Sequence, residues 1–349
     1  MSDDGQYQTA VEYNGNIWKS TDFGANWTEV DLPDVHEWVK VAMSDNGQFQ
    51  TAVAYSGNIW TSNDRGGNWT EVTSVSSPQL TFVAMSGNGM IQTAGLSQTG
   101  LSTFVSTDWG ANWSTVVLGA RTYNVEHGDM SNDGSIQVLV DPSTYESFVS
   151  NTSGSSWPTS SGESGYFHHP NEALWGLSIS DSGKDITGVG NSGRIRVSND
   201  FGTSWSVKNI SSSDLFSVAV SSNGQIQTAV GNDAILSSSD YGDTWNETSV
   251  SGGDFYGIAM SANGTKQTAV KLNGKIWTCN AESSTPDEPS TPDAPVTPTA
   301  EPPAPPVTPT AEPPASPPSD SETLGAGAIA GIAVGSVAVV GIGVYVGFS

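Results

Sequence analysis

Cysteine and basic residues are scarce in this chain. The first shortage excludes an intrachain disulfide, and the second argues against a nucleic-acid partner. The single cysteine, Cys279, excludes an intrachain disulfide. Only 11 lysines and arginines stand against 36 aspartates and glutamates, which gives a formal net charge of −25. Such an acidic surface repels phosphate backbones, so we expect no nucleic-acid partner. The first residues also lack the basic and apolar stretches of a secretory signal peptide.

Small and polar residues are abundant instead. The 349 residues include 39 glycines, and only 13% of the chain is charged. This composition favours many short strands joined by tight turns over helices. Length alone would allow two or three domains, but an internal repeat overrides that estimate because stacked units share one core.

Seven copies of one unit follow each other over residues 1–280. They align at the positions Met1, Met43, Met85, Met130, Ile179, Val220 and Met260. Copy two reads W-V-K-V-A-M-S over 38–44, N-G-Q-F-Q-T-A-V-A-Y over 46–55 and S-G-N-I-W-T-S over 56–62. Four β-rich runs in roughly 40–45 residues are the size of one propeller blade. We therefore predict an all-β fold, a seven-bladed β-propeller.

Within residues 1–280 the two ends of the repeat are incomplete. Copy one lacks the first β-run, and copy seven lacks the fourth. Either the ring closes imperfectly, or the true start lies upstream of Met1. The position of Met1 on a repeat methionine favours the second interpretation.

The sharpest motif is S-x-D-x-G-x-x-W, between the third and fourth runs of a copy. Five copies are intact, and in copy four Thr152 replaces the aspartate. The intact motifs comprise Ser20, Asp22, Gly24, Trp27, Ser62, Asp64, Gly66, Trp69, Ser106, Asp108, Gly110, Trp113, Ser198, Asp200, Gly202, Trp205, Ser238, Asp240, Gly242 and Trp245. Serine and aspartate side chains hydrogen-bond turn amides, glycine permits positive φ, and tryptophan covers the hairpin. We interpret all four positions as structural.

These boxes resemble the Asp-box, or BNR, repeat proteins, and the resemblance covers residues 1 to about 280. That group includes sialidases, sortilin-type receptor domains, xyloglucan-active glycosidases and photosystem II assembly factors. The resemblance implies a propeller with the box at the blade periphery, away from the ligand face. The assembly factors bind through an arginine-rich basic patch, from which this acidic chain departs.

A sialidase-like site would need three arginines to capture a carboxylate. The chain has only four, Arg65, Arg121, Arg194 and Arg196, and the F/Y-R-I-P motif of sialidases is absent. Other glycosidases need only two carboxylates, but no pair stands out. We expect no catalytic residues and no cofactor.

A metal site is equally unsupported. The connection 158–173 contains the aromatic and histidine residues of 166–169, which we expect to form a loop over the propeller mouth. Successive side chains of an extended segment point apart, so His168 and His169 do not predict a zinc site.

Binding is expected on the face opposite the boxes. One polar column lies six residues before the repeat methionine position and comprises Glu37, Gln79, Asn124, Asp214 and Asp254. A second mixed column, three residues before it, comprises Lys40, Phe82, His127, Gly176, Ser217 and Gly257. We predict that the polar members, including Lys40 and His127, line the channel and contact a glycan or protein ligand.

The last part of the chain changes composition. Residues 281–322 hold 14 prolines and read as a disordered stalk. In 323–349, the run 324–348 has no charge, and roughly 37 Å of helix would cross a bilayer. Gly327, Gly331 and Gly335 form a stripe that could pair two such helices.

The sequence therefore predicts a non-catalytic propeller held at a membrane by a single C-terminal segment. The propeller would lie in the extracellular or lumenal space; a cytosolic tail-anchored form and a GPI signal remain alternatives. A diverged glycosidase and an assembly factor for a membrane complex are the alternative functions.

Overall fold

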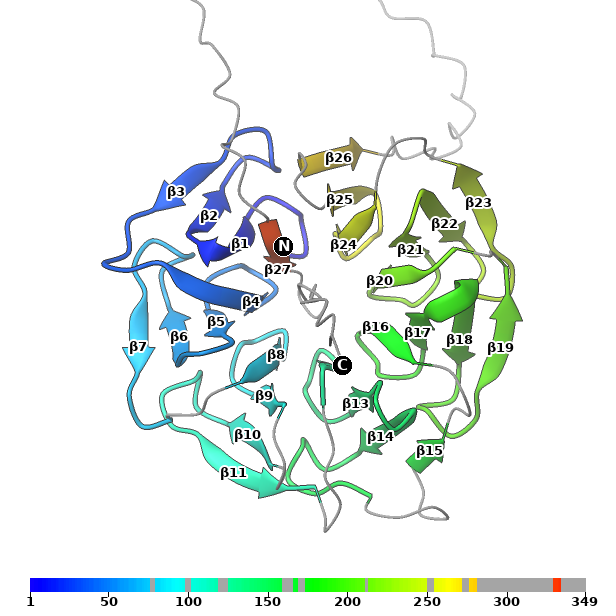
Figure 1. The fold of residues 1–349 in the computed structure, drawn as a ribbon, viewed down its shortest axis with the longest axis horizontal. Helices are drawn as coiled ribbons and strands as arrows, with labels where there is room; N and C mark the ends of the chain where they lie inside the picture. The colour runs from blue at the N-terminus through cyan, green and yellow to red at the C-terminus, as the bar shows by residue number, and fades with distance from the viewer. Residues whose placement is uncertain are drawn as a thin grey trace, which may run out of the picture. The chain divides into compact units, whose positions relative to one another are not determined.

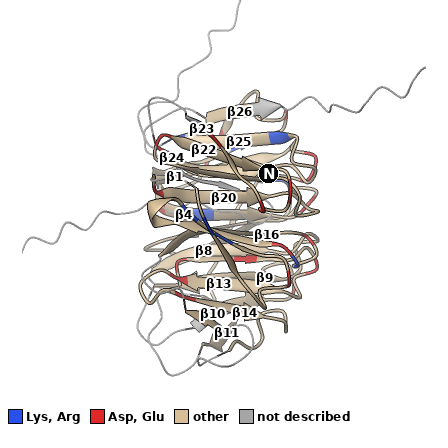
Figure 2. Ribbon diagram, turned by 90° about the vertical axis from the view of Figure 1, so that its right-hand side faces the viewer, with Lys and Arg blue, Asp and Glu red and all other residues tan. Residues whose placement is uncertain are grey.

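The computed structural model describes residues 1–75, 79–97, 102–118, 125–158, 166–168, 173–210, 213–249, 254–271, 276–280 and 329–333. Antiparallel strands form seven blades around a central axis, with the first strand of each complete blade nearest the axis (Figure 1). The first two blades share one eight-stranded sheet, because their strands also pair through Tyr13 and Glu37. The predicted all-β propeller fold is confirmed. In side view, basic positions are few, and many acidic positions lie at the ends of the strands (Figure 2).

The strands follow chain order within each blade. Blade 1 has β1 (Gln8–Gly15), β2 (Ile17–Ser20) and β3 (Thr28–Val30); blade 2 has β4 (His36–Met43), β5 (Gln50–Ala54), β6 (Ile59–Ser62) and β7 (Thr70–Val72). Blade 3 has β8 (Leu80–Met85), β9 (Gln92–Leu96), β10 (Ser102–Ser106) and β11 (Ser114–Val117); blade 4 has β12 (His127–Met130), β13 (Gln137–Asp141), β14 (Glu146–Ser150) and β15 (Tyr166–His168).

The remaining blades follow the same plan. Blade 5 has β16 (Leu174–Ile179), β17 (Ile186–Gly190), the 3₁₀ turn η1 (Asn191–Gly193), β18 (Arg194–Ser198) and β19 (Ser206–Asn209). Blade 6 has β20 (Leu215–Val220), β21 (Gln227–Gly231), β22 (Ala234–Ser238) and β23 (Asn246–Ser249). Blade 7 has β24 (Phe255–Met260), β25 (Lys266–Lys271) and β26 (Ile276–Asn280), and a further strand, β27 (Ile329–Ala333), pairs with β1.

A closed cycle of backbone hydrogen bonds joins the blades near the axis. After the repeat methionine position, each copy turns from its first to its second run, and one N–H of this turn donates to the carbonyl of the same turn in the next blade. The donors and acceptors run Asp3 to Asp45, Asp45 to Gly87, Gly87 to Asn132, Asn132 to Asp181, Asp181 to Ser222, Ser222 to Ala262 and Ala262 to Asp3, at 2.7–3.0 Å. We call this cycle the inner ring. Its last bond joins copy seven to copy one, so the seven blades close.

A serine at the start of each of these turns holds its shape. In blade 2, the buried Ser44 hydroxyl donates to Asn46 Oδ1 (2.9 Å) and accepts from the Phe49 N–H (3.0 Å). Gly47 follows at φ +71°, and a Cβ there would lie 2.8 Å from the Cβ of Tyr7 in blade 1. Glycine is therefore required both by the turn and by the close approach of the neighbouring blade.

A second layer of bonds joins the second strands of adjacent blades. Buried threonine hydroxyls donate to glutamine Oε1 atoms in the pairs Thr9–Gln50, Thr51–Gln92, Thr93–Gln137, Thr187–Gln227 and Thr268–Gln8. Between blades 4 and 5 the same positions hold Val138 and Ile186, both fully buried in one apolar cluster. Both polar partners are replaced together there, which leaves neither group unsatisfied.

The long connection after blade 4 differs from the prediction. Tyr166–His168 is β15, the fourth strand of blade 4, which pairs with β14 through Ser147 and Phe167 among others. It lies at the outer side of its blade rather than over the propeller mouth (Figure 1). The outer edge of β14 explains this position of β15. Without a neighbouring strand, the N–H and C=O groups along that edge would have no partners.

The described part of the C-terminal segment is a strand. Of residues 323–349, only β27 is described, and Gly331 within it pairs with Val11 of β1. No helix among the described residues is long and apolar enough to cross a membrane. The linker 281–322, Gly327 and Gly335 lie outside the described residues, so the helix over 324–348, its glycine stripe and the stalk stay predictions.

The junction between blades 3 and 4 offers a test of the second bond layer. Thr93→Val leaves the buried Gln137 Oε1 without its donor and should lower the free energy of unfolding by about 1–3 kcal/mol. Adding Gln137→Ile recreates the pair found between blades 4 and 5 and should recover part of that loss. Chemical denaturation of both single variants and the double variant measures the coupling. Strictly additive effects would contradict this account.

Candidate binding site where the innermost strands begin

Hydrogen bonds place the Asp boxes and the inner ring on the same face of the propeller. The fourth residue of each box donates its N–H to the turn of the inner ring in its own blade, as from Phe23 to Gln6 O (3.1 Å) and from Tyr241 to Gln225 O (3.2 Å). The boxes and the inner ring therefore share one face, which we call the box face. The innermost strands begin at the opposite face, which we call the start face.

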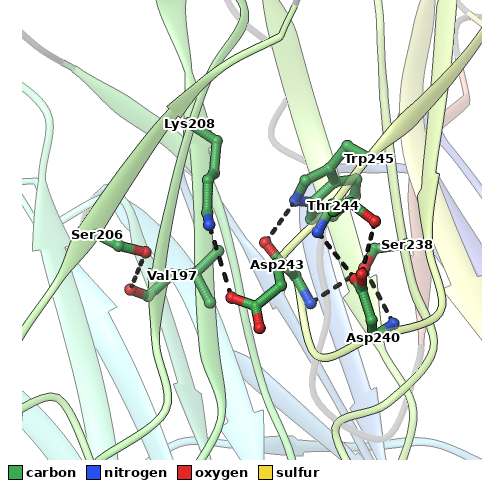
Figure 3. Close-up of polar contacts among 9 residues, drawn as sticks. Val197, Ser206, Lys208, Ser238, Asp240, Asp243, Thr244 and Trp245 are labelled. Carbon is green, nitrogen blue, oxygen red and sulfur yellow. Dashed lines mark hydrogen bonds and ion pairs between the residues drawn. The ribbon is translucent and has the colours of Figure 1, made fainter.

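The polar groups of each Asp box are used within the box. In blade 6, the Ser238 hydroxyl donates to Asp240 Oδ1 (2.8 Å) and accepts from the Gly242 N–H (3.0 Å) (Figure 3). Asp240 also accepts from the N–H of Thr244 (2.9 Å) and from its hydroxyl, and the Trp245 indole N–H donates to Gly242 O (3.0 Å). The bonds from Thr244, with that from Ser238, lower the pKa of Asp240 to about 2. Such an arrangement stabilises a hairpin and leaves few hydrogen-bonding groups of the box available to a ligand.

The box of copy four, in which Thr152 replaces the aspartate, keeps the same geometry with a weaker acceptor. Thr152 Oγ1 accepts from the Ser156 N–H at 3.0 Å, as the aspartate does elsewhere, and Ser150 still accepts from the Gly154 N–H at 3.2 Å. The hairpin therefore does not depend on a charge at this position.

A small polar cavity of about 30 Å³ lies at the inner ring. It is lined by several repeat methionine positions and by ring residues, among them Asp3, Asp45 and Asp181. Burial and the neighbouring Asp45 and Asp181 raise the pKa of Asp3 to about 7, and Asn132 Nδ2 donates to Asp45 Oδ2 (2.8 Å). The volume suits one water molecule rather than an organic ligand.

A bulge near the start of the innermost strands produces the most distinctive feature of the start face. The register shifts between Leu174 and Gly176, between Leu215 and Ser217, and between Phe255 and Gly257, so one residue of each strand is left outside the ladder. These bulged residues are Trp175, Phe216 and Tyr256. A bulge redirects the side chain of its extra residue.

The three bulged aromatic residues stack across blades 5, 6 and 7. The ring centroids of Trp175 and Phe216 lie 5.8 Å apart at 22°, and those of Phe216 and Tyr256 lie 4.6 Å apart at 10°. All three side chains are only partly buried. Burial and the nearby Asp254 raise the pKa of the Tyr256 hydroxyl. We call these three residues the aromatic stack.

The sequence columns did not include this position, which lies four residues before the repeat methionine position. The corresponding residues of blades 2, 3 and 4 are Val39, Thr81 and Glu126. The signal that could have found the stack is the aromatic residue in three consecutive copies, within the words L-W-G, L-F-S and F-Y-G.

The predicted column of Glu37, Gln79, Asp214 and Asp254 lies at or just before the innermost strands, and all four residues are partly buried. Glu37 accepts hydrogen bonds from the hydroxyls of Tyr13 and Ser56, and Asp214 Oδ1 accepts from the Ser192 N–H (2.8 Å). Asn124 lies outside the described residues. Asp214 and Asp254 belong to blades 6 and 7, which also carry Phe216 and Tyr256.

Lys40 and His127 are not channel-lining residues, which corrects the prediction. Their side chains are only 3% and 4% exposed. In blade 2, Lys40 comes directly after the bulged residue and is again paired with the second strand, opposite Val53. Burial lowers the pKa of Lys40 to about 7 against the opposing effect of Asp129, and burial, with Lys40, lowers that of His127 to about 3. These groups form a buried polar cluster, not a contact surface.

The described arginines are dispersed. Arg65 lies on the box face over the ring of Tyr7 in blade 1 (4.9 Å), whereas Arg194 and Arg196 belong to β18, the third strand of blade 5. Arg121 lies outside the described residues. No group of three His, Cys, Asp or Glu residues in the described ranges could hold a metal ion.

Lys40 makes stability depend on pH. Because its pKa is about 7 in the folded state and about 10.4 when exposed, the unfolded state binds more protons between these values. The free energy of unfolding should therefore rise by about 2 kcal/mol from pH 7 to pH 9 through this group. Urea unfolding of Lys40→Met should lose that rise, whereas the exposed control Lys184→Met should keep it. An equal pH dependence of wild type and Lys40→Met would contradict the assignment.

Comparisons with known proteins agree with this geometry. The sequence model of the BNR-Asp box repeat matches residues 17–30 and 59–72, which bracket the first two boxes. No curated protein matches the sequence. Two solved structures are similar: "YCF48 bound to D1 peptide", at 16% identity, and YCF48 from Cyanidioschyzon merolae, at 14%. Each has a TM-score of 0.60 and covers 80% of this chain and 92% of the other. The chain thus carries BNR-Asp box repeats in a propeller fold, and the resemblance to the Asp-box propellers is confirmed.

Proposed function

We propose that this chain is a non-catalytic binding propeller that holds a basic peptide segment of a partner protein at the start face of blades 5–7. The observation that carries the proposal is the aromatic stack of Trp175, Phe216 and Tyr256, partly exposed on three adjacent innermost strands. Stacked aromatic faces offer a large apolar surface and attract cations.

The charge of the surroundings supports a basic ligand. Asp214 and Asp254 lie two residues before Phe216 and Tyr256, and the whole chain carries a formal net charge of −25. Such a field speeds the approach of cationic segments and slows that of anionic ones. One of the two similar propellers, YCF48, is bound to a D1 peptide, which supports a peptide as the ligand class.

A glycan is the second candidate, because the same flat aromatic surface could receive a sugar ring. The acidic surroundings favour a basic peptide over a neutral sugar. An assembly role for a membrane complex is compatible with peptide binding. We propose that the apolar run 324–348 attaches the protein to that membrane in molecules in which residues 329–333 are not paired with β1, with the propeller on the extracellular or lumenal side.

Phe216→Ala tests the proposal. A panel of fluorescein-labelled decapeptides, basic, neutral and acidic, should bind in that order of decreasing affinity. Phe216→Ala should weaken the basic peptides about tenfold, because it removes the middle ring of the stack. Phe201→Ala is the matched control, since Phe201 is 47% exposed on the box face.

Fluorescence anisotropy and thermal unfolding of each variant separate binding from stability. Equal losses in Phe201→Ala and Phe216→Ala would contradict the assigned face. Sugar binding in a glycan array that is lost in Phe216→Ala, without peptide binding, would favour the glycan alternative.

A further inference from the structure

Blade 1 differs from the other blades in the origin of its innermost strand. In blades 2, 3, 5, 6 and 7, the second strand pairs on its axial side with a first strand that precedes it directly in the chain. In blade 1, the second strand is β1, and the corresponding partner is β27 from near the other end of the chain (Figure 1).

The register of this pairing matches that of the neighbouring blade residue by residue. In blade 1, Thr9, Ala10, Val11 and Glu12 face Ala333, Ile332, Gly331 and Ile329. In blade 7, Thr268, Ala269, Val270 and Lys271 face Ala259, Ile258, Gly257 and Phe255. The register shift falls at the same step, so Ala330 occupies the bulged position of Tyr256. A generic edge contact would have no reason to reproduce the bulge.

The sequences of the two strands agree as well. Residues 329–334 read I-A-G-I-A-V, and residues 255–260 read F-Y-G-I-A-M. The shared G-I-A falls on the same register positions in both blades. Ile332 thus has the register position of Val41, Val83, Leu177, Val218 and Ile258, the apolar column whose side chains are at most 4% exposed.

We propose that the axial edge of β1 is a strand-acceptor site and that residues 329–333 of the same chain fill it as the innermost strand of blade 1. An open strand edge at the axis would leave N–H and C=O groups unpaired, and an added strand satisfies them. The 48 residues between Asn280 and Ile329 can extend roughly 150 Å, which is ample for the return from blade 7 to blade 1.

The assignment has a consequence for the membrane. Residues 329–333 lie inside the uncharged run 324–348, which alone predicts a membrane helix. One segment cannot be a strand of blade 1 and part of a transmembrane helix at the same time. Closure of blade 1 and insertion into a bilayer therefore exclude each other in a single molecule.

Cross-linking tests the position of the strand. In full-length protein with Cys279→Ser, Ala10→Cys combined with Ile332→Cys should form an intramolecular disulfide on mild oxidation, because these two residues face each other across an antiparallel pair. Ala10→Cys combined with Ile342→Cys, ten residues further along the same apolar run, should not. Equal cross-linking of both pairs, no cross-link at all, or a bond between two chains would overturn the proposal.

A charge in the strand separates ring closure from membrane attachment. Ile332→Asp and Ile342→Asp each place one carboxylate in the apolar run, so both should reduce flotation with phosphatidylcholine vesicles if that run inserts. Only Ile332→Asp should speed amide exchange at residues 8–12, by about tenfold or more, because it disturbs the strand that covers β1. Equal exchange in the two variants would contradict the strand assignment, whatever the vesicles show.

Discussion

The inner ring is the interaction on which the rest of the propeller depends. Seven turns each donate one backbone hydrogen bond to the next blade and accept one from the previous blade, and the last bond returns from Ala262 to Asp3. A single bond of this kind contributes about 0.5–1.5 kcal/mol to the free energy of unfolding. The constraint is geometric: each first strand must end at the same distance from the axis. A turn that begins with serine, has asparagine, aspartate or serine at its third position and ends with glycine at positive φ meets this requirement in all seven copies.

Once the strand ends are held at the box face, the starts of the same strands are free to vary. In blades 2, 3, 5, 6 and 7, the bulge four residues before the repeat methionine position moves one side chain out of the ladder. The residue at this position differs around the axis. Blades 5–7 place tryptophan, phenylalanine and tyrosine there, whereas blades 2–4 have valine, threonine and glutamate. The structural residues of the repeat thus lie on the box face, and the candidate binding residues lie on the start face. This division explains why the Asp box identifies the fold but gives no information about the ligand.

Local sequence patterns made the fold predictable. Features that depend on pairing between distant parts of the chain could not be predicted from the sequence. The blade count and the boxes could be predicted because turn residues such as Ser62, Asp64 and Gly66 determine their own hairpin. The channel-lining residues could not, because a column of mixed residue types does not show whether its side chains face the channel or a neighbouring blade. Lys40 and His127 belong to such a column and are buried. The apolar run 324–348 has the length of a membrane helix. Its similarity to the first strand of a blade indicates a strand only once the structure shows that β1 has no first strand directly before it in the chain.

Native-state hydrogen exchange of the inner-ring amides tests whether the ring closes between the last copy and the first. If the ring is closed, the Ala262 amide, which donates to Asp3 O, exchanges as slowly as the amides of Asp3, Asp45, Gly87, Asn132, Asp181 and Ser222, and all seven respond together to low concentrations of denaturant. If the Ala262 amide exchanges at the rate of exposed turn amides while the other six stay protected, the ring is open between copies seven and one.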